Sequence, residues 1–328
     1  MVTLTLTNWK KYSQHLSNTL IMKIIVLVLK REKKYEQKYE RNWRDEMLYD
    51  KTVAFIGAGS MAEAMISGLV KSDQLPTDRI IATNRSNAER LFALEAKYGI
   101  KGCKVEDLQF DQIDVIILAM KPKDVDQALS GIKKHIKSNH LIISVLAGIT
   151  TTYLEQNLHN GQQVVRVMPN TSSAIGESAT AISPGHETSE NNVVLTKSLL
   201  GCIGEVYTID EKDMDIFTGL AGSGPAYFYY LMEHMEQQGA QAGFDMETTR
   251  KIIAQTIKGA AKMVQEQNET PTILREKVTS PNGTTAAGLN ALDENGGGQA
   301  IARAVEHAAK RSKEISEQIQ ESLLVNSK

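Results

Sequence analysis

The sequence has few of the residues that mark several common classes of protein. Its 328 residues include only two cysteines, Cys103 and Cys202, which lie far apart and lack the spacing of metal ligands. This argues against a disulfide framework and against a zinc site, and it is typical of the reducing cytosol. Aromatic residues make up only 5% of the chain, so alanine, isoleucine, valine and methionine fill most apolar positions.

Neither an excess of one charge nor a long apolar run is present. The formal net charge is −2, which leaves no electrostatic footprint for nucleic acid. The apolar run from Leu20 to Leu29 is interrupted by Lys23 and is shorter than the ~20 residues that a membrane-spanning helix needs. Hydrophobic residues nevertheless make up 41% of the chain, enough for real cores, and the length favours two domains.

Residues 1–46 differ in composition from the rest of the chain. They hold ten Lys and Arg against five Asp and Glu, and they contain both tryptophans, Trp9 and Trp43. One interpretation is a targeting or membrane-surface arm, although no small-residue cleavage site follows the apolar run. We favour an extension that is disordered or not part of the native protein. The codons of Trp43 and Arg44 can spell a ribosome-binding sequence, so we expect Met47 to be the true start.

A short apolar segment, Thr52–Ile56, turns through Gly57 and Gly59 into a predicted helix, Ser60–Val70. In a dinucleotide site, the first glycine allows the tight turn and the second lets the pyrophosphate approach the backbone at the helix start. Ala62 stands where a third glycine is common. A plain strand–turn–helix is the alternative, but the motif opens a series of strand–helix units, which favours the dinucleotide site.

The end of the second predicted strand, Arg79–Thr83, indicates which dinucleotide would bind. An NAD site usually has an acidic residue here, to bind the ribose 2′-hydroxyl. This sequence has Asn84–Arg85–Ser86 instead. Arg85 can pair with the 2′-phosphate of NADP, and Asn84 and Ser86 can donate hydrogen bonds to it. An ordinary exposed loop arginine is the alternative, and the position favours the phosphate.

Further strands follow, separated by helical stretches. The predicted strands are Ile113–Leu118, Leu141–Leu146, Gln163–Met168, Ser178–Ile182 and Glu205–Ile209. The first of these is a near-continuous apolar run, as in a parallel strand that is buried on both faces. The alternation predicts a doubly wound parallel sheet. Ligands of such sheets bind at the carboxyl ends of the strands, so the segment after Leu118 should border the nicotinamide ribose.

From about Asp213 onward the sequence predicts only helices. The expected helices are Ala226–Ala242, Met246–Gln267, Pro271–Val278, Thr284–Asp293 and Gln299–Leu323. Gly222–Pro225 is predicted to be a loop whose proline begins the first of these helices. Helices this apolar in a domain of this size would leave apolar surface uncovered within one subunit, so we expect an interlocked dimer.

A turn followed by two threonines stands out in the helical half. Ser280–Gly283 predicts a turn, and Thr284 and Thr285 begin the next helix. Backbone N–H groups at a helix start, beside two hydroxyl groups, can bind a carboxylate. An ordinary N-cap is the alternative, and threonine often provides one. The spacing alone favours the ordinary cap.

Five blocks of sequence, in the same order, resemble those of the pyrroline-5-carboxylate reductase family. They are Phe55–Met61 (FIGAGSM), Ala119–Pro122 (AMKP), Val167–Thr171 (VMPNT), Leu220–Ala226 (LAGSGPA) and Pro271–Asp293 (PTILREKVTSPNGTTAAGLNALD). The last block is highly specific, whereas the glycine motif alone would suggest only a dinucleotide-binding fold. The resemblance covers about residues 50–325.

The resemblance implies a fold and an activity. The fold would be α/β: a Rossmann-type NADP-binding domain over residues 47–212, then an all-α dimerisation and substrate domain over residues 213–328. The activity would be reduction of 1-pyrroline-5-carboxylate to L-proline, the last step of proline biosynthesis, with NADPH favoured and NADH possible. The protein would be a cytoplasmic homodimer or larger homo-oligomer, with no metal, nucleic acid or membrane partner.

The resemblance also assigns residues by position. The cofactor-binding residues would be Ile56, Gly57, Gly59, Ser60, Met61, Asn84, Arg85, Ala119, Met120, Lys121, Pro122, Ala147 and Gly148. The substrate-binding residues would be Ser280, Gly283, Thr284 and Thr285. The Thr285 hydroxyl would contact the ring nitrogen, and water or the protonated substrate would supply the proton. Asn282, where glycine is commoner, and Asn268, where some members carry an acidic residue, depart from the family pattern.

Three other functions stay open on the sequence. A β-hydroxyacid dehydrogenase could share the scaffold, but it usually relies on a lysine, whereas this specific loop is rich in hydroxyl groups. A reductase of another cyclic imine would need a similar loop. A non-catalytic, NADP-binding regulatory paralogue should lose the carboxylate-binding corner, and this chain keeps Gly283–Thr285.

Overall fold

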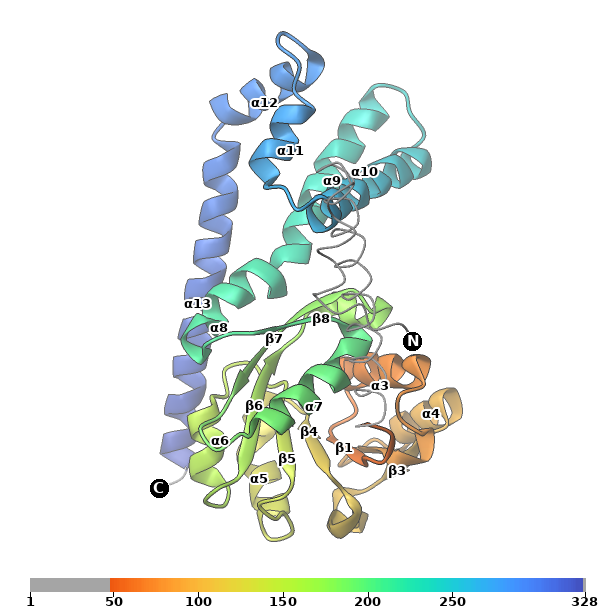
Figure 1. Cartoon of the computed structure of the whole chain (residues 1–328), viewed down its shortest axis with the longest axis vertical. Helices are drawn as coiled ribbons and strands as arrows, with labels where there is room; N and C mark the ends of the chain where they lie inside the picture. The colour runs from red at the N-terminus through yellow and green to blue at the C-terminus, as the bar shows by residue number, and fades with distance from the viewer. Residues whose placement is uncertain (1–47, 327–328) are drawn as a thin grey trace, which may run out of the picture. The chain divides into compact units, whose positions relative to one another are not determined.

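A computed structural model describes residues 48–326, and the chain from Thr52 onward forms one compact unit. The predictions on residues 1–46 and on Met47 as the start lie outside the described residues. An eight-stranded sheet is the centre of the first half (Figure 1), with strand order β3-β2-β1-β4-β5-β6-β7-β8. The strands are β1 (Val53–Ile56), β2 (Ile80–Thr83), β3 (Lys101–Cys103), β4 (Val115–Leu118), β5 (Leu141–Ser144), β6 (Gln163–Met168), β7 (Ser178–Pro184) and β8 (Gly204–Thr208).

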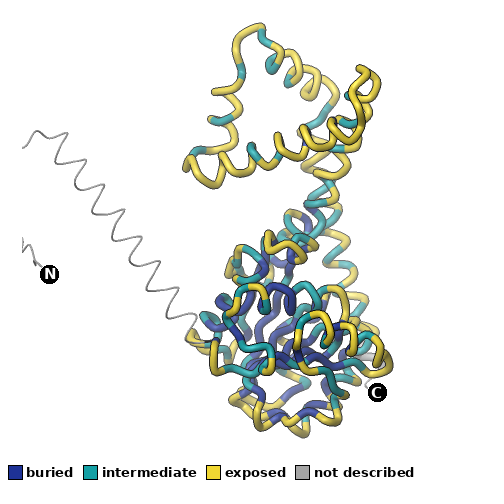
Figure 2. Tube along the Cα trace, turned by 90° about the vertical axis from the view of Figure 1, so that its right-hand side faces the viewer, coloured by how far each residue is buried: buried dark blue, intermediate teal, exposed yellow. Residues whose placement is uncertain are grey.

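The sheet is doubly wound, as predicted. Strands β1, β4 and β5 are buried along their whole length, which explains their continuous apolar sequences. Helices pack against the sheet: α3 (Ser60–Ser72), α4 (Ala88–Tyr98), α5 (Val125–Lys133), α6 (Thr151–Asn157) and α7 (Glu190–Leu200). Figure 2 shows the buried residues concentrated in this half of the unit. Strand β3 was not predicted, because its sequence, Lys-Gly-Cys, is short and carries no apolar pattern.

One part of the predicted parallel sheet is wrong. Strands β6 and β7 pair antiparallel, while β7 and β8 are parallel to each other. Parallel neighbours need a crossover of about a dozen residues or more. The link between Met168 and Ser178 is shorter and holds only the 3-10 turn Thr171–Ile175. The chain therefore reverses at the edge of β6, and the last two strands run against the rest.

The second half is helical, as predicted. Its helices are α8 (Met214–Phe217), α9 (Gly224–Gln241), α10 (Met246–Gln267), α11 (Pro271–Lys277), α12 (Thr284–Glu294) and α13 (Gly297–Asn326). The predicted loop Gly222–Pro225 is wrong. A π-helical turn, Thr218–Gly222, joins α8 to α9, and the Ser223 N–H donates to the Thr218 carbonyl at 2.8 Å. Pro225 lies in the first turn of α9, where its missing N–H leaves no bond unmade.

Much of the apolar surface in this half is exposed in the single chain. Tyr230 on α9 is 61% exposed, and Val278, just after α11, is 66% exposed. The other large exposed apolar residues of α9 to α12 are Phe228, Tyr229, Leu231, Met235, Met246, Ile252, Met263, Val264, Ile273 and Leu292. Contiguous apolar surface on this scale marks an interface with another molecule.

Candidate functional site

The turn between β1 and α3 has the backbone geometry of a phosphate-binding loop. Gly57 has φ +112°, and a Cβ there would lie 2.7 Å from the carbonyl of Ala119, so only glycine fits. Gly59 is the N-cap of α3, and a Cβ there would meet only the Ala119 oxygen, at 3.9 Å. The space beside the Gly59 Cα is therefore open. The first N–H groups of α3, from Ser60, have no partner within the helix and can bind an anion.

A partly buried network that the sequence did not reveal supports this loop. The Glu63 carboxylate accepts hydrogen bonds from Arg90 (2.5 Å), Lys97 (2.9 Å) and the Tyr98 hydroxyl (3.0 Å). Arg90 Nε also donates to the Ala58 carbonyl, at 2.9 Å, inside the loop. The Lys97 hydrogen bond, followed by that from Arg90, lowers the pKa of Glu63 to about 2. The network therefore ties α3 and α4 to the glycine turn.

The structure places Asn84 and Arg85 at the carboxyl end of β2. Arg85 is exposed, and its Nη1 donates to the Gln127 side chain in α5. The Asn84 Oδ1 accepts from the backbone N–H groups of Ser86 (3.1 Å) and Asn87 (2.9 Å), which fixes the turn. The guanidinium group is held at the surface beside the loop of β1, where an arginine can pair with a 2′-phosphate.

The predicted nicotinamide-side segments follow β4 and β5. The Ala119 N–H donates to the Ile56 carbonyl at 2.9 Å, which joins the ends of β4 and β1. Ala119, Met120 and Pro122 are half-buried, and Lys121 is exposed. After β5, Ala147 is exposed and Gly148 is buried, with φ +77°. These segments lie at the same edge of the sheet, since β1, β4 and β5 are parallel neighbours.

The C-terminal segment of α13 packs against Gly148. A Cβ on Gly148 would lie 2.9 Å from Ile319 Cδ1 and 3.2 Å from Ser316 Cα. Gly148 is therefore required both by its positive φ and by this close approach of the helix. No sequence pattern predicts this contact, because it joins the first half of the unit to the end of the chain.

In the threonine corner, the residue at the N-cap is Gly283, so neither threonine caps the helix. Gly283 is the N-cap of α12, and Thr284 and Thr285 are its first two residues. Their hydroxyl groups have no hydrogen-bond partner among the described residues, so they remain available to a ligand. The Gly283 N–H donates to the Ser280 carbonyl at 3.0 Å, which closes the turn. Asn282 has φ +60°, a conformation that glycine adopts without strain and that asparagine tolerates better than most residues.

This corner and the nicotinamide-side segments are not brought together within one chain. Helix α13 begins at Gly297, just after α12, and the first of its residues near Gly148 is Ser316. The stretch of α13 from Gly297 to Ser316 is ~28 Å long at 1.5 Å per residue. Helix α12 is only ~16 Å long, so even if it ran antiparallel to α13 its first residues would not reach Gly148. Figure 1 shows α11 and α12 at the end of α13 away from the sheet.

Asn170, at the carboxyl end of β6, was part of a sequence block but had no assigned role. It is buried, and its Nδ2 donates to the Ala221 carbonyl at 3.1 Å, within the π-helical turn. Its Oδ1 accepts from the Ser172 N–H at 3.0 Å. A Cβ on Gly222 would lie 3.2 Å from Met168 Cε. The turn thus packs directly on the end of β6, and π-turns often lie at functional sites.

Among the described residues, these positions have neither a metal-binding cluster nor a reactive thiol. They contain no group of three or more His, Cys, Asp or Glu side chains arranged to hold a metal ion. Both cysteines are free, and burial raises the pKa of the Cys202 thiol to about 12, so it stays protonated. Across residues 48–326, no helix has the length and apolar character needed to cross a membrane.

Two family models match the chain, one in each half. Residues 52–148 match NADP oxidoreductase coenzyme F420-dependent, and residues 211–315 match pyrroline-5-carboxylate reductase dimerisation. The chain is 62% identical over 270 residues to pyrroline-5-carboxylate reductase 1 of Bacillus subtilis (strain 168), over 82% of this chain and 91% of the relative.

Solved structures of similar proteins agree with these matches. A pyrroline-5-carboxylate reductase from Coxiella burnetii superposes with a TM-score of 0.76 and 30% identity, over 81% of this chain and 98% of the other. The pyrroline carboxylate reductase of Plasmodium falciparum with NADP bound gives a TM-score of 0.73 and 27% identity, over 82% and 99% of the two chains.

Proposed function

The chain belongs to the pyrroline-5-carboxylate reductase family, and from this premise we propose how its residues carry the reaction. It reduces 1-pyrroline-5-carboxylate to L-proline with NAD(P)H, in the last step of proline biosynthesis. A relative that is 62% identical in sequence is named for this activity. The geometric observation that supports the proposal is a pair of complementary sites: a glycine turn for a dinucleotide, and a helix start with two free hydroxyl groups for a carboxylate.

The glycine turn and the end of β2 fit NADPH. The open side of Gly59 and the N–H groups from Ser60 and Met61 would hold the pyrophosphate, next to Ile56 and Gly57. Arg85 would pair with the 2′-phosphate, and this pairing would favour NADPH over NADH. Ala119 to Pro122 and Ala147–Gly148 would line the nicotinamide. When bound there, the cofactor supplies a hydride from C4 of its ring.

The start of α12 fits the substrate. The N–H groups of Thr284 and Thr285, with Gly283 and Ser280 at the turn, would bind the carboxylate. The Thr285 hydroxyl would hydrogen-bond to the ring nitrogen. The hydride adds to C5, the C=N bond becomes a single bond, and the nitrogen takes a proton or already carries one. The residues therefore act mainly by holding C5 and the nicotinamide in contact and by excluding water.

A second copy of the chain completes this site in our proposal. Hydride transfer requires reacting atoms ~3–3.5 Å apart, and within one chain the corner at Thr285 lies too far from Gly148. The protein forms a homo-oligomer through its helical half, as the matched dimerisation model indicates. We propose a dimer in which the exposed apolar faces of α9 and α10 are buried, and in which each corner faces the partner's nicotinamide-side segments. Residues 47–212 and 213–328 would then be the two domains.

The alternatives find less support in the structure. A regulatory paralogue would have no need for the hydroxyl groups of Thr284 and Thr285 to stay free, and a reductase of another cyclic imine would also need a corner that fits its substrate. We propose a cytoplasmic location, which two free thiols and the use of NADPH support.

Growth of a proline auxotroph tests the function in a cell. A strain that lacks pyrroline-5-carboxylate reductase should grow without proline when it carries this gene, and should grow more slowly when the gene carries Thr285→Ala. If neither the native gene nor the variant restores growth, although the protein is folded, the regulatory paralogue would be favoured. Equally fast growth with both would remove Thr285 from the mechanism.

A further inference from the structure

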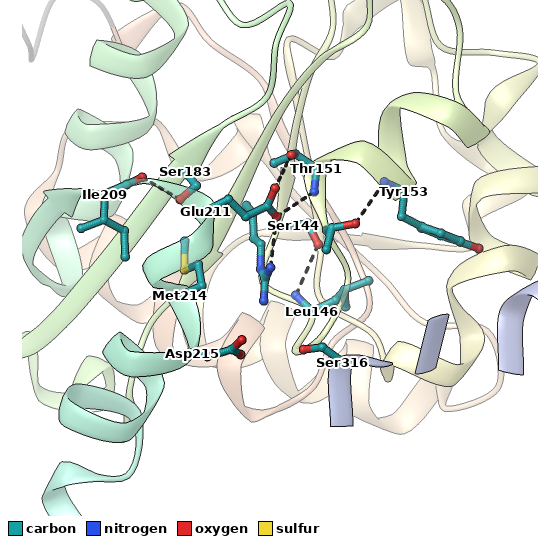
Figure 3. Close-up of polar contacts among 12 residues, drawn as sticks. Ser144, Leu146, Thr151, Tyr153, Ser183, Ile209, Glu211, Met214, Asp215 and Ser316 are labelled. Carbon is teal, nitrogen blue, oxygen red and sulfur yellow. Dashed lines mark hydrogen bonds and ion pairs between the residues drawn. The ribbon is translucent and has the colours of Figure 1, made fainter. Parts of the chain in front are cut away.

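One carboxylate joins three elements beside the predicted nicotinamide-side segment. Glu211 Oε1 accepts from the Thr151 N–H at 2.9 Å and from Arg166 Nη1 at 3.0 Å, and its Oε2 accepts from the Thr151 hydroxyl at 2.5 Å. Figure 3 shows Glu211 pointing at Thr151, between strands of the sheet and the start of α8. Residues far apart in the sequence thus meet at a single side chain.

The elements joined by Glu211 all lead to the predicted site. Thr151 is the first residue of α6 and follows Gly148 by three residues. Arg166 lies in β6, which ends at Met168, two residues before Asn170. Glu211 precedes α8, which continues through the π-helical turn into α9. The Glu211 side chain therefore connects the segment that would line the nicotinamide to the start of the helical half.

A second contact, between α8 and α13, supports Gly148 from the other side. Asp215, the second residue of α8, accepts a hydrogen bond from the Ser312 hydroxyl of α13 at 2.7 Å. One turn further along α13, Ser316 and Ile319 pack against Gly148. Figure 3 shows Asp215 and Ser316 on the same side of Glu211. Gly148 is thus held from one side through Thr151 and from the other by α13.

Burial distinguishes this ion pair from its neighbours. The side chains of Arg166 and Glu211 are only 10% and 26% exposed. The adjacent pair Asp210–Lys212 is 71% and 74% exposed at 2.8 Å. Exposed pairs contribute little, whereas removal of one partner of a buried pair leaves an uncompensated charge. A specific role is therefore expected of Glu211 and not of the exposed Asp210 and Lys212 beside it.

We propose that Glu211 is a positioning residue for hydride transfer. It acts through Thr151 and Gly148: the two bonds to Thr151 fix the start of α6, and that start fixes the segment Ala147–Gly148. The bond to Arg166 holds the carboxylate in place. The inference rests on the proposed nicotinamide position beside Gly148, because only then does a shift of this segment change the distance over which the hydride moves.

Single-turnover kinetics separate positioning from folding. Enzyme saturated with NADPH and 1-pyrroline-5-carboxylate is followed by stopped-flow absorbance, with NADPH and with NADPH deuterated at the transferred position of C4. In Glu211→Gln and Thr151→Val, we expect the rate constant to fall about 10- to 100-fold, as a misplacement of about 1 Å can cause. The amplitude should stay that of the native protein, and deuteration should slow the step further, which identifies it as hydride transfer.

Matched variants serve as controls for this test. Thr151→Ser keeps the hydroxyl group and should restore most of the rate, and Asp210→Asn should leave it unchanged. Should Glu211→Gln fold poorly, the double variant Glu211→Leu/Arg166→Met removes both charges of the pair and both hydrogen bonds to Thr151, so its rate constant should still be low.

Two results would overturn the proposal. A native rate constant with reduced amplitude in the Glu211 and Thr151 variants would show that the cluster only stabilises the fold. A slow step without a deuterium effect would show that it governs binding or release. Native protein that does not oxidise NADPH with this substrate at all would contradict the proposed function itself, and the role of Glu211 with it.

Discussion

Arg85 is the single residue on which the choice of cofactor rests. A charge-assisted hydrogen bond is worth about 1.5–3 kcal/mol. Arg85→Ala should therefore raise the KM for NADPH by about 10- to 100-fold, while the KM for NADH, which has no 2′-phosphate, stays unchanged. Steady-state rates with both cofactors measure this. Gln127→Ala, which removes only the partner of the guanidinium group, should have a smaller effect in the same direction. Equal losses with NADPH and NADH would contradict the assignment.

Thr285 is the residue expected to contact the substrate nitrogen. Its hydroxyl group has no partner among the described residues, so its removal should leave the fold intact. Thr285→Ala should lower kcat by about 10- to 100-fold, by the loss of one hydrogen bond made in a site closed to water. NADPH binding, followed by fluorescence titration, should be unchanged, and Thr285→Ser should keep most of the activity. Weakened NADPH binding in Thr285→Ala would place the residue elsewhere in the site.

The sequence predicted single residues well where one conformation or one chemical group decides. Gly57 was expected at a tight turn, and the structure shows both a positive φ and a contact that only glycine tolerates. Arg85 could be proposed because the sequence has an arginine where NAD sites usually have an acidic residue, and the threonine corner because two hydroxyl groups follow a predicted turn. Both roles stay predictions. Glu211 could not be found this way, since its partners Thr151 and Arg166 are 60 and 45 residues away and form no motif with it.

At the scale of elements, the contact between α3 and α4 should make stability depend on pH. The Glu63 pKa is about 2 in the folded protein and 4.5 ordinarily, with the Lys97 and Arg90 hydrogen bonds as the main causes. The stabilisation is therefore complete above pH 4.5 and is lost as the pH falls toward 2. Glu63→Gln should lower the free energy of unfolding at pH 7 by about 1–3 kcal/mol, and its difference from the native protein should shrink as the pH falls through this window.

Denaturant unfolding at several pH values measures this difference. Asp111→Asn is a matched control, because the Asp111–Lys137 pair is 77% and 62% exposed and should contribute little at any pH. A Glu63→Gln deficit that stays the same from pH 7 down to pH 2.5 would show that packing, and not the carboxylate charge, holds α3 to α4.

The elements were predictable to the extent that hydrophobic pattern defines them. Strands β1, β4 and β5 are apolar throughout and were predicted, with boundaries shifted by a few residues. The direction of β7 was not predictable, because an apolar pattern does not encode strand direction. The π-helical turn was predicted as a loop because Gly222–Pro225 has loop chemistry, whereas contacts with Asn170 and Met168 keep the chain helical there.

At the scale of the whole molecule, activity should depend on association. The exposed aromatic residues of α9, which include Phe228 and Tyr230, are expected to be buried against a second copy. Phe228→Glu should shift the protein toward monomer and abolish most of its activity, since each site needs a corner from the partner. Sedimentation and NADPH oxidation, measured at the same protein concentration, check this.

Phe92 provides the control for that experiment. It is 72% exposed but lies on α4, in the dinucleotide half of the unit. Phe92→Glu should leave both association and activity unchanged. A monomeric Phe228→Glu variant that keeps full activity would contradict a site shared between subunits, and would require the corner at Thr285 to reach Gly148 within one chain.

The most direct test of the central claim is the loss of NADPH absorbance when purified protein is mixed with 1-pyrroline-5-carboxylate, with proline measured in the same samples. We predict rapid loss with NADPH, one proline formed for each NADPH oxidised, and slower loss with NADH. No loss with either cofactor, from folded and associated protein, would contradict the function proposed for this chain.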